Sequence, residues 1–136
     1  MPLIIHVPSR APGRDSLPAS SIDVMPTILG ILKLPPHPAY QGVDLANRAG
    51  RRDRPLFTLT QTAMADQVSV EQDQWKLIFD LRRSAARLYD LRDDPGELRD
   101  VAAQFPAQRD ALMETMATWW SRQIGYYRQL PARPEY

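Results

Sequence analysis

The sequence predicts an α/β fold, α+β in detail, in which one buried strand and a helix precede a small antiparallel sheet of about four strands and a C-terminal helix. Three patterns predict it: an apolar, β-branched run at the start, apolar and polar residues alternating between positions 57 and 91, and apolar residues at helical spacing after position 106. Thirteen prolines in 136 residues argue against an all-helical bundle.

The first part, residues 1–54, is predicted to hold a strand and a helix. The apolar run Leu3–Val7 is typical of a strand covered on both faces. A helix is expected from about Ile22 to Leu34, with Asp23 placed to cap its first turn and Pro26 early enough to be tolerated there. Its apolar positions at helical spacing are Ile22, Met25, Ile28, Leu29 and Leu32.

The second part, residues 55–136, is predicted to form the antiparallel sheet and the long helix. Alternation indicates strands around Phe57–Gln61, Val68–Val70 and Trp75–Phe79, with a hairpin connection at Gln72-Asp73-Gln74 and a fourth strand at Arg87–Leu91. Asp94-Pro95-Gly96-Glu97 has the pattern of a helix start. A helix from Pro106 to about Arg128 should lay one stripe on the open face of the sheet: Leu112, Met116, Trp119, Trp120, Gln123, Ile124 and Tyr127.

Composition excludes several classes of function. A net charge of +1 provides no global field toward nucleic acid or an anionic membrane. The cluster Arg48, Arg51, Arg52 and Arg54 favours a solvated loop over an anion or nucleic-acid site, because no aromatic residues interleave with it. No cysteine is available for disulfides, thiolate zinc sites or a thiol nucleophile, and the apolar runs are too short to span a bilayer. We expect a soluble protein, with the cytoplasm favoured over the periplasm.

No catalytic set emerges from residue spacing. His6 lies inside the apolar run and is predicted to be a hydrogen-bonded core histidine, whereas His37 lies between two prolines in a loop. Asp90, Asp93 and Asp94 fit a turn and a helix cap better than a cation site. Ser20 and Ser21 precede the first helix and favour capping over nucleophilic catalysis, since neither lies in a Gly-x-Ser-x-Gly turn.

The order of several motifs carries more information than any one of them. The chain shows in succession Pro2-Leu3-Ile4-Ile5, Ser20-Ser21-Ile22-Asp23-Val24-Met25-Pro26-Thr27-Ile28-Leu29, Gln41-Gly42-Val43-Asp44-Leu45, Trp75-Lys76-Leu77-Ile78, Leu88-Tyr89-Asp90-Leu91 and Asp94-Pro95-Gly96-Glu97. This succession closely resembles the C-terminal region of sulfatases of the alkaline-phosphatase superfamily, of the arylsulfatase and choline-sulfatase type. The resemblance covers about residues 2–103, and Asp100 stands where the family usually has asparagine.

The resemblance implies a parent enzyme that hydrolyses sulfuric, or phosphoric, esters with a formylglycine nucleophile and a calcium-like divalent cation. The family's C/S-x-P-x-R nucleophile motif and its acidic metal ligands precede the first strand, so no catalytic or metal residue can be assigned to this chain and no cofactor is expected in it. We therefore expect a structural fragment of the parent, inactive alone, whose first strand and helix belong to the main α/β domain. The matching motif residues are expected to be structural: Asp23, Pro26, Thr27, Trp75, Tyr89, Asp90, Asp94, Pro95 and Glu97.

Two further expectations follow from the resemblance. Loops after Val7 and around residues 35–42 would border the parent's substrate pocket, which makes Arg10, Arg14 and His37 candidate contacts for an anionic substrate. The expected partner is the missing N-terminal part of the parent, or a second copy of the chain. The alternative is a standalone, self-associating interaction module derived from a sulfatase, with no nucleic acid or membrane as partner.

Overall fold

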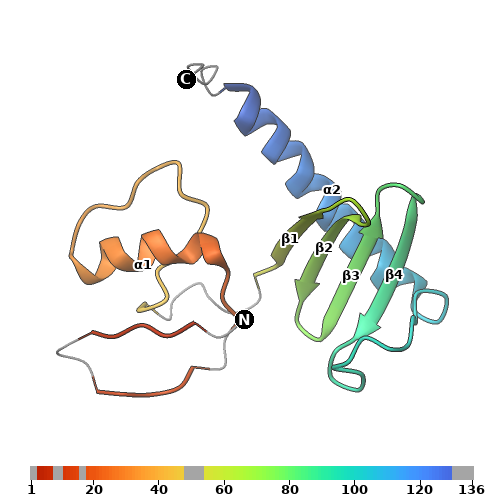
Figure 1. Cartoon of the computed structure of the whole chain (residues 1–136), viewed down its shortest axis with the longest axis horizontal. Coiled ribbons are helices and arrows are strands. Elements are labelled where there is room, and N and C mark those ends of the chain that lie inside the picture. Colours follow the sequence, from red (N-terminus) through yellow and green to blue (C-terminus); the bar gives the residue numbers. More distant parts are fainter. Residues whose placement is uncertain (1–2, 8–10, 16–17, 48–53, 130–136) are drawn as a thin grey trace. The chain divides into compact units, whose positions relative to one another are not determined.

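The structure is a computed structural model that describes residues 3–7, 11–15, 18–47 and 54–129. The chain divides into two compact units, an N-terminal unit, Met1–Leu56, and a C-terminal unit, Phe57–Tyr136 (Figure 1). Neither helix in the described part of the chain is both long and apolar enough to cross a membrane.

The N-terminal unit is built around one short helix. The 3-10 turn η1, Ser21–Asp23, leads directly into α1, Val24–Ile31. The helix ends three residues before the predicted Leu34, because Lys33 adopts a left-handed conformation with a φ of 56°. The amides of Lys33 and Leu34 then donate to the carbonyls of Gly30 and Leu29, at 3.1 and 2.9 Å. This pair of bonds is a Schellman motif, which satisfies the last carbonyls of the helix.

The predicted strand Leu3–Val7 is absent, and this prediction is wrong. These residues have no regular secondary structure, and Ile4 exposes 89% of its surface. His6 is exposed as well, so it is not the predicted core histidine. A strand needs a neighbouring strand for its backbone hydrogen bonds. The described residues of this unit before β1 contain the 3-10 turn and the helix but no strand that could pair with residues 3–7.

The helix α1 buries its polar face and exposes its apolar face. Asp23 and Thr27 are fully buried, at 0% and 2% exposure. Ile22, Met25 and Ile28, three of the apolar positions at helical spacing, expose between 41% and 54% of their surface. The reason is that the loop that follows α1 packs against the polar side of the helix.

The C-terminal unit contains a four-stranded antiparallel sheet with the strands in sequence order (Figure 1). The strands are β1, Leu56–Gln61; β2, Asp66–Gln72; β3, Trp75–Asp80; and β4, Ala85–Asp90. The structure confirms the predicted four-stranded sheet. In the register, Leu77 of β3 lies opposite Val70 of β2 and Leu88 of β4. All three are 0% exposed, so the alternation seen in the sequence marks the core face.

Short turns connect the strands and account for the register. The connection between β2 and β3 is Asp73-Gln74 alone, since Gln72 pairs with Trp75, and Asp73 has a φ of 55°. After β3, the buried Asp80 accepts the backbone N–H groups of Arg82 and Arg83, at 3.0 and 2.9 Å. The hydrogen bond from the Arg83 N–H is the main reason that the pKa of Asp80 lies below its ordinary value. Burial of the carboxylate acts in the opposite direction, and the bond from Arg82 adds to the lowering.

An arginine joins two of these turns. The guanidinium of Arg82, after β3, donates to the carbonyl oxygens of Thr62 and Ala63 in the connection between β1 and β2, at 3.1 Å each. Carbonyls at a hairpin tip are otherwise left to water. The contact therefore links the β1–β2 connection to the β3–β4 connection at one end of the sheet.

The long helix α2, Pro106–Gln129, closes one face of the sheet, as predicted (Figure 1). Leu112 and Met116 are buried in the same core cluster as the central strands. Trp119 stacks flat on Phe57, with ring centroids 4.5 Å apart and an angle of 4° between the planes. The apolar stripe of the helix continues past this stack, where Ile124 is 40% exposed.

The segment between β4 and α2 is a series of turns, and the predicted helix start at Asp94 is wrong. Glu97 has a φ of 55°, which ends any helical continuation, and its N–H donates to the Asp94 carbonyl at 3.1 Å. The chain then follows β4: the Val101 amide donates to the Leu88 carbonyl at 2.8 Å, and Val101 and Ala102 enter the core. Helix α2 begins only at Pro106.

Candidate functional site

Asp23 is the centre of a hydrogen-bond network in the N-terminal unit. It lies at the junction of η1 and α1, and its carboxylate is completely buried. One oxygen accepts the Ser20 N–H at 2.7 Å, and the other accepts the Val43 N–H at 2.9 Å, from twenty residues further along the chain. The first bond closes the turn that precedes α1, and the second holds the loop that follows α1. Asp23 therefore connects the two segments that flank the helix.

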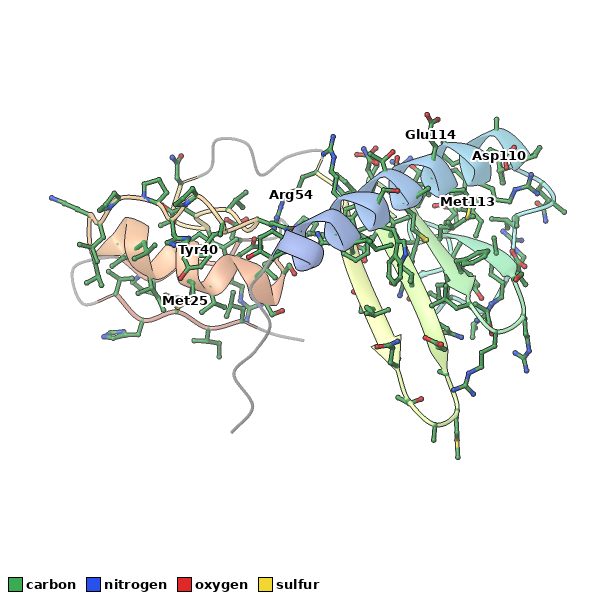
Figure 2. The ribbon with its side chains drawn as sticks, turned by 90° about the horizontal axis from the view of Figure 1, so that it is seen from above. Met25, Tyr40, Arg54, Asp110, Met113 and Glu114 are labelled. Atoms are coloured by element: carbon green, nitrogen blue, oxygen red, sulfur yellow. The ribbon has the colours of Figure 1, made fainter. Side chains whose placement is uncertain are left out.

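Arg54 completes the network by forming an ion pair with Asp23. It lies just before β1, and its side chain is 17% exposed (Figure 2). Within the described part of the structure, its Nε is buried without a hydrogen-bond acceptor. The carboxylate of Asp23 thus supplies a counter-charge to a largely buried guanidinium group.

The loop of residues 42–47 packs against η1 and α1 at two further points. The Thr27 hydroxyl donates to the Asp23 carbonyl at 2.7 Å and accepts the Leu45 N–H at 2.9 Å. Gly42 lies against the Ile22 carbonyl, where a Cβ would overlap the oxygen. Pro26 has no N–H to donate to that carbonyl, which leaves it accessible to the loop. Glycine and proline thus allow a backbone approach that other residues would block.

The candidate substrate contacts do not form a site in the described structure. Arg10 lies outside the described residues. Arg14 is exposed in a segment without regular structure. His37 is exposed on the loop after α1; its ring centroid lies 5.0 Å from that of Tyr40, and its Nδ1 accepts the Ala39 N–H at 3.2 Å. Their role as substrate contacts stays a prediction.

The acidic residues after β4 have structural partners. Asp90 accepts the Gln74 side-chain amide and the Arg92 N–H, each at 3.0 Å. Asp94 accepts the Arg99 N–H at 2.8 Å, and this bond, together with one from the Leu98 amide, lowers the Asp94 pKa. Glu97 forms an ion pair with Lys76 of β3. These carboxylates hold turns and strands in place.

The other motif residues of this unit also belong to its architecture. Tyr89 is buried at 5% exposure, and the ring of Trp75 lies 5.0 Å from that of Phe105, just before α2. Pro95 occupies the turn between Asp94 and Glu97. Among the described residues, no group of three or more His, Cys, Asp or Glu side chains could hold a metal ion.

Two residues important to this arrangement were missed from the sequence. Arg54 was assigned to a solvated arginine loop, which is wrong for this residue; Arg48, Arg51 and Arg52 lie outside the described residues. Asp100 accepts the Leu88 N–H at 3.0 Å and the Ala102 N–H at 2.9 Å, so its side chain takes the place of a strand partner at the edge of β4. The sequence offered one signal for this role: Asp100 stands where sulfatases usually have asparagine. Aspartate and asparagine side chains both carry an oxygen that can accept these N–H groups.

Comparison with known proteins found a relative by sequence. The chain is 30% identical over 109 residues to the choline-sulfatase of Rhizobium meliloti strain 1021, a match that covers 75% of this chain and 21% of that protein. No family model matches the sequence. The chain therefore spans about a fifth of the length of this relative.

Solved structures with the same fold include several sulfatases. The crystal structure of Ps i-CgsB matches 84% of this chain and 27% of its own, with a TM-score of 0.69 and 21% identity. The structure of BT1596, a 2-O GAG sulfatase, matches 83% of this chain and 27% of its own, with a TM-score of 0.64 and 17% identity. By sequence and by fold, this chain is therefore similar to a C-terminal portion of larger sulfatases, about a fifth to a quarter of their length.

Proposed function

We propose that this chain is a structural portion of a sulfatase-type enzyme that hydrolyses sulfuric, or phosphoric, esters, and that the catalytic centre lies in other parts of the parent protein. The match to a choline-sulfatase at 30% identity over 109 residues carries this proposal. In this proposal the role of the chain is architectural: the sheet and α2 form a closing subdomain, and the N-terminal unit adds a helix to the main α/β domain.

The geometry of the acidic residues supports an architectural role. The buried carboxylates of Asp23 and Asp80 each accept two backbone N–H groups, and Asp23 is also paired with Arg54. A carboxylate whose lone pairs are already engaged in this way is a poor cation ligand, because coordination would break bonds that hold the fold together.

The cofactors of the parent do not fit the residues described here. A calcium-like cation takes six to eight oxygen ligands, which requires several converging carboxylates. Among the described residues, Asp23, Asp80, Asp90 and Asp94 each accept backbone N–H groups in a different turn or loop. The formylglycine and the cation of the parent are therefore proposed to reside in sequence outside this chain.

The proposal is tested by assaying the purified chain for hydrolysis of 4-nitrophenyl sulfate, choline sulfate and 4-nitrophenyl phosphate, with and without added calcium. We expect no saturable turnover and no heat of calcium binding by titration calorimetry. The choline-sulfatase assayed in parallel serves as the positive control. Saturable, calcium-dependent turnover by the pure chain would overturn the proposal.

A graft tests the architectural role directly. The homologous segment of the choline-sulfatase is replaced by this chain, and the product is compared with the same graft carrying Asp23→Ala. We expect the first graft to fold and to keep hydrolysing choline sulfate, and the second to lose soluble yield and activity together. Equal activity of the two grafts would contradict the role assigned to the Asp23 network.

The alternative, a standalone interaction module, is favoured by one observation. Apolar side chains on α1 and on residues 3–5 are exposed to solvent in the chain as it folds here. A soluble protein rarely leaves a continuous apolar surface of this kind uncovered.

A further inference from the structure

We draw no further inference here: the strongest candidate, the exposed apolar side of α1 together with residues 3–5, carries nothing, because the chain spans about a fifth of the relative it matches and nothing in the structure shows what covers this surface.

Discussion

Replacing Asp23 by alanine should loosen the N-terminal unit and leave the C-terminal unit unchanged. The substitution removes the acceptor for the Ser20 and Val43 amides and the counter-charge of Arg54. Because the Arg54 Nε is already buried without an acceptor in the described structure, loss of the carboxylate removes the counter-charge of a guanidinium group that is only partly compensated. Breaking a buried pair in this way costs about 3–5 kcal/mol.

The magnitude translates into a measurable rate. About 3 kcal/mol corresponds to roughly a hundredfold shift in an opening equilibrium. We therefore expect the Val43 and Leu45 amides to exchange with deuterium about a hundredfold faster in Asp23→Ala than in the wild type. In Arg54→Met the carboxylate keeps its two N–H donors, so the acceleration should be smaller. Asp23→Ala combined with Arg54→Met should recover part of the protection, since no buried charge then remains unpaired.

The chain offers an internal control for this experiment. All three tryptophans, Trp75, Trp119 and Trp120, belong to the C-terminal unit. The urea midpoint followed by tryptophan fluorescence should therefore stay the same in Asp23→Ala. The reasoning is refuted if exchange at Val43 is unchanged, or if the double substitution is worse than Asp23→Ala alone.

Three further changes have expected outcomes. Leu77→Ala, at a fully buried position in the central strand β3, should lower the unfolding free energy of the C-terminal unit by about 2–5 kcal/mol through cavity formation, and a loss below about 1 kcal/mol in urea unfolding would argue against the core described. Gly42→Ala should speed exchange throughout α1, because its Cβ would overlap the Ile22 carbonyl, whereas Gly13→Ala, with nothing within 4 Å, should be neutral. Asp80 has a folded pKa below its unfolded value near 3.8, so its stabilising effect is present above that pH and is lost as the pH falls through the folded value. In Asp80→Asn, the urea midpoint followed by tryptophan fluorescence should therefore fall less steeply as the pH is lowered. A dependence of this midpoint on pH identical to that of the wild type would show that Asp80 does not contribute.

The C-terminal unit could be predicted from the sequence because its determinants are local. Alternating residues such as Val68, Val70 and Leu77 mark one face of each strand, and each strand pairs with its neighbour in the chain. The turn at Glu97 could not be predicted in the same way. Asp94-Pro95-Gly96-Glu97 satisfies the rules for a helix start, but the left-handed Glu97 and the alignment of Val101 with β4 depend on tertiary packing.

The N-terminal unit shows where periodicity alone misleads. The apolar run Leu3–Val7 predicts a buried strand, yet burial depends on a partner that the run itself does not encode. The spacing of Ile22, Met25 and Ile28 correctly indicates a helix, but the residues buried in this chain are the polar Asp23 and Thr27 on its other side. Asp23 was predicted to cap the first turn of the helix, which is wrong, because its carboxylate accepts the Ser20 and Val43 amides and makes no capping bond to α1. Its contacts with Val43 and Arg54 span 20 and 31 residues and left no local signal in the sequence.

The order of the strands in the sheet has a consequence for how the C-terminal unit folds. Its connections are four, two and four residues long, so each pairing closes a short loop at small entropic cost. Sheets usually form slowly because their contacts join distant parts of a chain. Here the successive hairpins can form one after another, and only the docking of α2 on Phe57 and the central strands requires a longer search. We therefore expect the sheet of this unit to form faster than a sheet of equal size whose neighbouring strands are far apart in the chain.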